Sequence, residues 1–215
     1  MVEPSELRTS KRTLREAVER DVEAMSRAAR RAADQAIMDR LIARCEWTDA
    51  GEVLLYRSLP HEVATEPLLH EALEAGKRLY LPRISGRTMG FYHIPQALAL
   101  SQLARHRFGM YEPPEGTDQW HAPAEGERRA VVVCPGRVFD MRGNRIGHGS
   151  GYYDRFLRVI RSTEAGRAGV RSLGICYEAQ VRDAVPTSPS DEPVDLVVTE
   201  RRVLSPRIDR GASIE

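Results

Sequence analysis

A strand–helix–strand pattern between residues 53 and 81 constrains the fold more than any other feature of this 215-residue chain. The apolar run Val53–Tyr56 predicts a buried strand, and residues 66–75 predict a helix that ends at Gly76. A second strand is predicted over residues 78–81, ending at Pro82. Strands joined by short links through a helix form a βαβ unit, in which the two strands lie parallel. The chain is therefore predicted to have an α/β fold with a mostly parallel sheet.

Further signals along the chain extend this α/β pattern. Short apolar runs predict strands over residues 89–94, 130–134, 172–177 and 194–199, and a helix is predicted over residues 152–162. Residues 95–129 are rich in Pro, Gly, Glu and His and lack sustained periodicity. That stretch predicts either a long functional loop or a set of short irregular pieces.

Two helices are expected before the first strand. Leu7, Leu14, Val18 and Val22 recur at three- and four-residue intervals between charges, which is typical of an amphipathic helix. Ser26 suits the N-cap of a second helix. We therefore expect one α/β domain over residues 1–215, with an N-terminal helical hairpin (residues 5–48) packed against it.

Composition excludes several classes of protein. The formal net charge is +1, so nothing indicates a nucleic-acid or anionic-membrane partner. The longest apolar runs are too short to span a bilayer, and the N-terminus has no signal-peptide pattern. The three cysteines have no close spacing, which favours neither a disulfide framework nor a zinc site. We expect a cytoplasmic protein, by default a monomer.

The strongest local signal is a glycine-rich stretch, Gly147–Asp154, directly before the predicted helix. Glycines at alternate positions (147, 149 and 151) let the backbone approach a ligand closely. The helix dipole and the unpaired amides at a helix N-terminus favour an anion, most naturally a phosphate. The stretch matches neither the P-loop nor the dinucleotide fingerprint. The alternative to a phosphate-binding loop is a plain mobile turn.

Other polar residues are candidates for the same site. Asp154 falls in the first helical turn, where a carboxylate either complements the helix dipole or binds magnesium. Tyr152 and Tyr153 either stack on a flat heterocycle or pack, but two adjacent helical residues cannot both face the core. Glu62 follows a predicted parallel strand, and Asp191 lies in a Pro-rich loop before the last one. The alternative for Glu62 is the ordinary surface position of a lone glutamate.

Lysine usage singles out one further residue. Of the 32 lysine and arginine residues, only Lys11 and Lys77 are lysines. Lys77 follows Gly76 at a predicted helix end, which suits a structural role. Lys11 has no such explanation, and an ammonium is a compact charge that a guanidinium does not copy.

Taken together, these residues resemble the 5-formyltetrahydrofolate cyclo-ligase family, also called methenyltetrahydrofolate synthetases. The resemblance is collinear over nearly the whole chain, and its most specific part is the Gly-x-Gly-x-Gly-Tyr-Tyr-Asp-Arg block. The other matching segments are Lys11–Arg15, Tyr56–Thr65, Gly76–Arg78, Met89–Tyr92, Phe108–Pro113, Pro135–Asp140, Tyr177–Val181 and Asp191–Glu200. Three positions depart from the family pattern: Arg137, Ser150 and Ser190.

The resemblance implies a fold and a reaction. The fold would be a three-layer, Rossmann-like α/β domain. The enzyme would use MgATP to phosphorylate the formyl oxygen of 5-formyltetrahydrofolate. Attack by N10 and loss of phosphate would then give 5,10-methenyltetrahydrofolate and ADP. Phosphorylation turns a poor leaving group into a good one, and phosphoryl transfer mainly needs positioning and charge neutralisation.

The resemblance also implies roles for individual residues. Glu62, Lys11 and Arg145 would be catalytic, and Asp154 and Asp191 would bind Mg²⁺. The folate side would be formed by Arg15, Tyr56, Glu62, Tyr152 and Tyr153. The ATP site would contain Lys11, Arg15, Arg145, Ile146, Gly147, His148, Gly149, Ser150, Gly151, Tyr152 and Tyr153. Two rival hypotheses are an ATP-dependent enzyme for another formamide and a non-catalytic nucleotide- or folate-binding relative.

Overall fold

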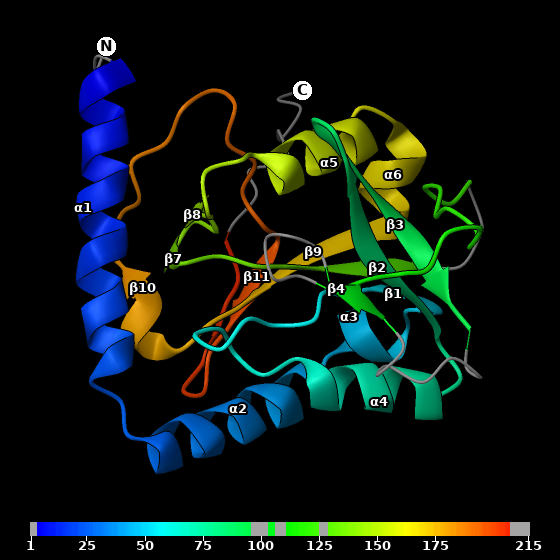
Figure 1. Ribbon diagram of the computed structural model, residues 1–215, viewed down its shortest axis with the longest axis horizontal. Helices are drawn as coiled ribbons and strands as arrows, with labels where there is room; N and C mark the ends of the chain where they lie inside the picture. The colour runs from blue at the N-terminus through cyan, green and yellow to red at the C-terminus, as the bar shows by residue number, and fades with distance from the viewer. Residues whose placement is uncertain (1–3, 96–102, 106–110, 125–128, 207–215) are drawn as a thin grey trace, which may run out of the picture.

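A seven-stranded sheet forms the centre of the computed structural model, which describes residues 4–95, 103–105, 111–124 and 129–206 (Figure 1). The strand order is β12-β11-β9-β6-β1-β2-β3. The five inner strands run parallel, and the edge strands β3 and β12 are antiparallel to their neighbours. The strands are β1 (Glu52–Leu54), β2 (Arg78–Ser85), β3 (Thr88–Ile94), β6 (Ala130–Cys134), β9 (Val170–Ile175), β11 (Leu196–Val198) and β12 (Val203–Leu204). The predicted mixed α/β fold with a mostly parallel sheet is confirmed.

Each face of this sheet is covered by an apolar core. Successive side chains of an inner strand point to opposite faces, so they belong alternately to the two cores. Along β6, Val131 and Val133 belong to one apolar core, whereas Val132 and Cys134 belong to the other. Helices α2 (Arg27–Ile42), α3 (Cys45–Thr48) and α4 (Glu66–Glu74) lie on one side. Helices α5 (Tyr152–Arg161) and α6 (Glu164–Gly169) lie on the other (Figure 1).

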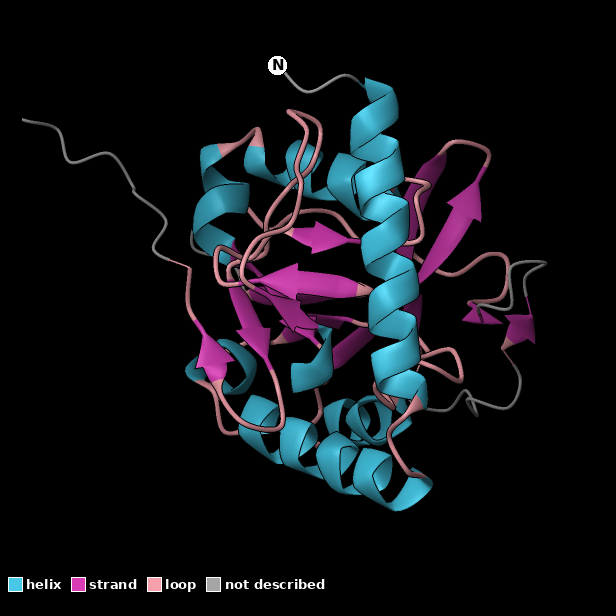
Figure 2. Ribbon diagram, turned by 90° about the vertical axis from the view of Figure 1, so that its left-hand side faces the viewer, coloured by secondary structure: helices cyan, strands magenta, loops and turns pink. Residues whose placement is uncertain are grey.

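Both expected N-terminal helices are present, but they are not packed side by side as a hairpin. Helix α1 (Pro4–Glu23) stands along one end of the sheet, while α2 runs beneath it in a different direction (Figures 1 and 2). The Ser26 hydroxyl accepts from the backbone N–H of Ala29, as expected of an N-cap. The helices separate because their apolar stripes have different targets. Helix α1 packs on the segments after β6 and β9, whereas the α2 side chain of Arg40 donates to the carbonyl of Thr199 after β11.

Strand β2 continues beyond the predicted stop at Pro82. Its pairing with β1 ends at Tyr80, so Pro82 lies where the strand pairs only with the antiparallel edge strand β3. The β2–β3 hairpin turns at Gly86, whose φ is 58°. The sequence pattern could not show that an edge partner would extend the strand.

The segment after β3 consists of short irregular pieces where it is described. Strand β4 (Ala104–Arg105) pairs with β5 (Tyr111–Glu112), and residues 96–102, 106–110 and 125–128 lie outside the described residues. The Trp120 indole N–H donates to the buried carboxylate of Glu52 at 2.8 Å. This bond holds the described part of the segment against the sheet.

A small three-stranded sheet lies between α1 and the carboxyl ends of the main strands. It has the order β10 (Val181–Arg182), β7 (Val138–Asp140), β8 (Arg145–Ile146). The buried carboxylate of Asp140 fixes the β7–β8 turn by accepting from the backbone N–H groups of Arg142 and Asn144. These strands were not predicted, because two or three residues carry no measurable periodicity.

The connections create a topological switch point between the neighbouring strands β1 and β6. After β1 the chain passes through α4, whose Leu68 and Leu69 belong to one core. After β6 it passes through α5, whose Leu157 and Ile160 belong to the other core. The two connections leave toward opposite faces of the sheet. Open α/β sheets bind ligands at the carboxyl ends of the strands beside such a switch point.

Replacement of Gly143 by alanine is expected to destabilise this end of the fold. Gly143 has φ 77° in the β7–β8 turn, and an added Cβ would meet the carbonyl oxygen of Val194. The matched control is Gly76→Ala, because Gly76 has φ 69° and a Cβ added there would have nothing within 4 Å. The control should lose about 1–2 kcal/mol from left-handed strain, and Gly143→Ala clearly more. Equal losses of unfolding free energy in urea would contradict a steric role for Gly143.

Candidate active site

The glycine loop, defined as residues 147–151, connects β8 to α5 at the switch point (Figure 1). Gly149 and Gly151 have φ values of 104° and 65°, a region that disfavours any residue with a Cβ. Gly151 is the N-cap of α5 and supplies no side-chain hydrogen bond to the first helical turn. The first amides of α5 therefore remain available to an anion, as the glycine spacing predicted.

Helix α1 brings Arg15 to this loop and Lys11 to Asp191. Lys11 and Arg15 lie one turn apart, so they project from the same face of the helix. The Arg15 Nε donates to the carbonyl of Gly147 at 2.8 Å. The Lys11 ammonium lies 2.5 Å from a carboxylate oxygen of Asp191. Helix α1 thus forms one wall of the site, and residues far apart in sequence meet there.

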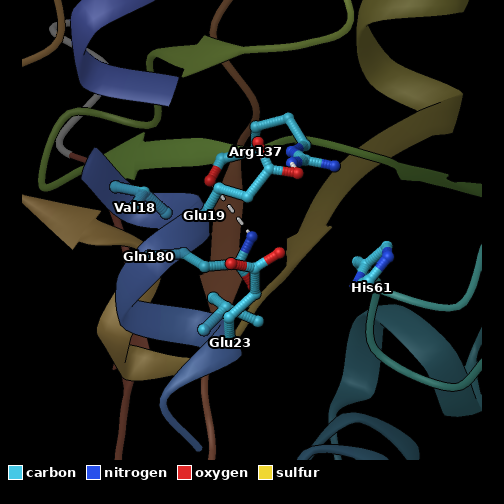
Figure 3. Close-up of a pocket in the computed structure, with 7 residues that line it drawn as sticks. Val18, Glu19, Glu23, His61, Arg137 and Gln180 are labelled. Carbon is cyan, nitrogen blue, oxygen red and sulfur yellow. Dashed lines mark hydrogen bonds and ion pairs between the residues drawn. The ribbon is translucent and has the colours of Figure 1, made fainter. Parts of the chain in front are cut away.

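A third cation, Arg137, lies beside them, at a position that the sequence marked only as a departure from a motif. Figure 3 shows Glu19 of α1 and Arg137 joined by an ion pair, which is 2.6 Å long, with His61 on the opposite side of a small cavity. Burial lowers the pKa of Arg15, and the positive charge of Arg137 lowers it further. Two neighbouring guanidinium groups, of which Glu19 neutralises only one directly, favour a negatively charged ligand.

Asp154 and Asp191, the two expected metal ligands, lie close together because the loop before β11 is hydrogen-bonded to Asp154. Asp154 Oδ1 accepts from the Arg145 guanidinium at 3.0 Å and from the Glu192 backbone N–H at 3.1 Å. Asp191 is the residue before Glu192, and its Oδ2 accepts from Lys11 and from Ser188. The hydrogen bonds between described residues leave Asp154 Oδ2 and Asp191 Oδ1 unused. Within the described residues, no group of three or more His, Cys, Asp or Glu side chains is gathered for a metal.

Arg145 is the most buried cation of the site, with only 3% of its side chain exposed. Asp154 neutralises it, and its Nε has no hydrogen-bond partner among the described residues. A buried guanidinium with a free N–H group is costly unless a ligand completes its hydrogen bonds. Ile146, which follows it, is buried in the apolar core, so only its backbone can contribute to the site.

Glu62 reaches the glycine loop from the opposite wall. Its side chain is 8% exposed, and one oxygen accepts from the backbone N–H of Leu59 at 2.8 Å. The other oxygen lies 3.2 Å from Nε2 of His148 in the glycine loop. This contact joins the loop after β1 to the loop before α5, although 86 residues separate them. The sequence did not predict it.

The three candidate tyrosines divide between the interior and the surface. Burial raises the pKa of Tyr56 and of Tyr153 well above the ordinary tyrosine value, and the Glu62 carboxylate raises both further. Both phenols therefore remain neutral. The Tyr153 hydroxyl is buried without a hydrogen-bond partner among the described residues. Tyr152 instead donates to the carbonyl of Gly86 in the β2–β3 turn, so the structure does not bring it to Glu62.

A groove of about 360 Å³ borders the loop that carries Glu62. Its walls are charged and aromatic, and one of its lining residues, Glu62, contacts His148 of the glycine loop. Other lining residues are Arg30, Asp34, Arg57, Tyr111 and Tyr177.

Fold and site together define a mixed α/β protein with a glycine loop, flanked by cationic side chains, at a topological switch point. The profile of the 5-formyltetrahydrofolate cyclo-ligase family matches residues 7–200. This chain belongs to that family. No described helix is long and apolar enough to cross a membrane.

Individual relatives agree with this assignment. The solution NMR structure of the 5,10-methenyltetrahydrofolate synthetase of Aquifex aeolicus is 31% identical, with a TM-score of 0.75, covering 95% of this chain and 96% of that one. The 5-formyltetrahydrofolate cyclo-ligase of Mus musculus is 24% identical over 194 residues, covering 89% of this chain and 94% of that protein. A 5,10-methenyltetrahydrofolate synthetase from Mycoplasma pneumoniae, at 20% identity and a TM-score of 0.65 over 88% and 98% of the two chains, shares the fold.

Proposed function

We propose that this protein catalyses the ATP-dependent cyclisation of 5-formyltetrahydrofolate to 5,10-methenyltetrahydrofolate, with release of ADP and phosphate. One observation carries the proposal: the glycine loop is contacted by Arg15 of helix α1 on one side and by the buried carboxylate of Glu62 on the other. A phosphate-binding loop next to a buried carboxylate suits a reaction that phosphorylates one part of a substrate and moves a proton on another. We propose that the sheet serves as a Rossmann-like nucleotide-binding domain.

On the nucleotide side, the backbone of Gly147–Gly151 would hold phosphate oxygens with the first amides of α5. Lys11, Arg15 and Arg145 would neutralise the charge that develops as the terminal phosphoryl group moves to the formyl oxygen. The unpaired Nε of Arg145 supports this role, because a phosphate oxygen would satisfy it. Among the other proposed ATP ligands, His148 and Ser150 are exposed in the loop, and Tyr152 follows the loop and donates to Gly86.

Asp154 and Asp191 fit a Mg²⁺ ion that arrives with the nucleotide. One or two carboxylates with phosphate oxygens and waters are the usual magnesium ligands in nucleotide sites. The unused oxygens Asp154 Oδ2 and Asp191 Oδ1 support this assignment. When bound, Mg²⁺ would neutralise phosphate charge and favour transfer.

On the folate side, Glu62 would face the reacting nitrogens, and the neutral phenols of Tyr56 and Tyr153 would line the pocket behind it. The groove beside Glu62 would admit the remainder of the folate, since flat aromatic groups and charged ends both suit its walls. Arg15, which reaches the glycine loop, would lie between the two ligands.

The reaction is tested by mixing enzyme, ATP, Mg²⁺ and 5-formyltetrahydrofolate and following methenyltetrahydrofolate by its near-ultraviolet absorbance. We expect one ADP for each methenyl product and no product without ATP. ATP hydrolysis without methenyl product would favour another formamide substrate. Binding of both ligands without turnover would favour a non-catalytic relative.

Several expectations from the sequence stay proposals. They are a single domain over residues 1–215, a cytoplasmic location, a monomer, and the lack of a nucleic-acid partner. Size-exclusion chromatography with light scattering tests the monomer, for which a mass near 24.2 kDa is expected.

A further inference from the structure

The contact between Glu62 and His148 connects the interior of the site with solvent. The Glu62 side chain is 8% exposed, whereas the His148 side chain is 49% exposed. Glu62 is held rigidly, because Leu59 donates its backbone N–H to Oε2 and its carbonyl accepts from the Glu62 backbone N–H at 3.0 Å. Only Oε1 faces His148, with 3.2 Å between Oε1 and Nε2. A fixed, buried carboxylate therefore touches an imidazole whose other side is open to water.

We propose that Glu62 and His148 form a proton relay for the cyclisation step, an inference that rests on the proposed function. The N10 electron pair forms the new bond to the formyl carbon, and the carbon–oxygen bond to the phosphate breaks. Phosphate leaves with that electron pair, and the proton on N10 passes to Oε1 of Glu62. His148 takes this proton at Nε2 and releases one to solvent from Nδ1. Glu62 contacts the substrate, and His148 is a positioning and relay residue that acts through Glu62.

The groups around Glu62 favour His148 as the exit for this proton. Tyr56 in the loop after β1 and Tyr153 on α5 hold their protons, because burial raises their pKa values. Arg145 on β8 and Arg15 on α1 are guanidinium groups, which do not exchange protons near neutral pH. Imidazole is the side chain suited to that task.

The remaining charged neighbours of Glu62 point to other partners. In the groove beside it, Arg57 lies 3.4 Å from Glu66. His61 belongs to the same loop but lines the separate small cavity next to α1 (Figure 3). Among the described residues in contact with Glu62, the exposed imidazole of His148 thus provides the path to water.

The relay is tested by chemical rescue in single turnovers, with enzyme in excess over 5-formyltetrahydrofolate and saturating MgATP. We expect His148→Ala to lower the rate of methenyl formation about 10²-fold, with folate affinity changed less than about threefold. Added imidazole should restore the rate at least about tenfold in a saturable manner. His148→Gln keeps a hydrogen bond to Glu62 without a transferable proton, so it should be as slow as His148→Ala.

The control is His70→Ala, which removes an exposed histidine on α4 and should leave the rate and its insensitivity to imidazole unchanged. A normal rate in His148→Gln, or a slow His148→Ala enzyme that imidazole does not accelerate, would overturn the relay. Absence of methenyl product with the wild-type protein would instead overturn the proposed function. The two failures are therefore distinguishable.

Discussion

Replacement of Asp154 by asparagine is expected to lower turnover by about 10²–10³-fold while the protein stays folded. Asparagine keeps an oxygen at the Oδ1 position, so it still accepts from the Glu192 backbone N–H and from Arg145. The negative charge is lost, however, and with it the proposed metal ligand. The measurement is the rate of methenyl formation over a range of Mg²⁺ concentrations, and the Mg²⁺ requirement should rise.

The choice of asparagine over alanine follows from the burial of Arg145. Both variants remove the counter-charge of a guanidinium that is 3% exposed, but Asp154→Ala also leaves Arg145 and the Glu192 N–H without an acceptor, so it should cost about 3 kcal/mol or more. A loss of activity in Asp154→Ala would mix unfolding with chemistry. Thermal unfolding should therefore separate the two variants, with Asp154→Asn less destabilised than Asp154→Ala.

A matched control lies on the same loop. The Glu192 side chain pairs with Arg158 and Arg161, away from the glycine loop. Glu192→Gln removes a carboxylate close to Asp154 and keeps the backbone bond, so its activity should remain within about threefold of wild type. Wild-type activity and Mg²⁺ dependence in Asp154→Asn would refute the metal role of Asp154.

Most strands of the main sheet could be predicted because they lie in apolar runs, whereas the two-residue edge strand β12 was not predicted. Residues 130–134 are buried on both faces and form a continuous apolar run. The small sheet could not be predicted in this way. Its β7–β8 turn depends on Asp140, a buried carboxylate that looks like a surface residue in the sequence. The direction of α1 relative to α2 depends on this unpredicted sheet, so the expected hairpin was not found.

The glycine loop was predictable because glycine spacing and a following helix have a local physical meaning. The partners of the loop were not, because they depend on which strands are neighbours. Glu62 reaches His148 only because β1 and β6 are adjacent. The βαβ pattern in the sequence does not determine which strands become neighbours in the sheet. Tyr152 and Tyr153 were correctly expected to face different ways, since adjacent residues on a helix must do so. Which of them faces inward required the structure.

The ion pair between Lys11 and Asp191 predicts opposite effects on nucleotide binding for the two residues. Burial alone would raise the pKa of Asp191, but the hydrogen bonds from Lys11 and Ser188 and the charge of Lys11 lower it below its ordinary value. The Asp191 carboxylate is therefore charged near neutral pH. A phosphate group that binds Lys11 must first compete with this carboxylate.

Lys11→Met is expected to reduce kcat/KM for ATP by about 10²-fold or more, because the variant lacks a charge aimed at the phosphates. Asp191→Asn should behave differently. It frees the Lys11 ammonium, so ATP without Mg²⁺ should bind about tenfold more tightly than to wild type, which corresponds to about 1.4 kcal/mol. Turnover with MgATP should nevertheless fall, since one proposed metal ligand is gone.

Isothermal titration with ATP in the presence and absence of EDTA, combined with the methenyl assay, distinguishes these effects. Arg12→Met is the matched control, because Arg12 lies next to Lys11 on α1 with 71% of its side chain exposed. It removes one positive charge from the same helix and should change ATP affinity less than about threefold, as salt screens exposed charges. Asp191→Asn could instead weaken the binding of metal-free ATP as much as Lys11→Met does. In that case Asp191 would hold Lys11 in position for the phosphate. That outcome would rule out the proposal that Asp191 and the phosphate compete for Lys11.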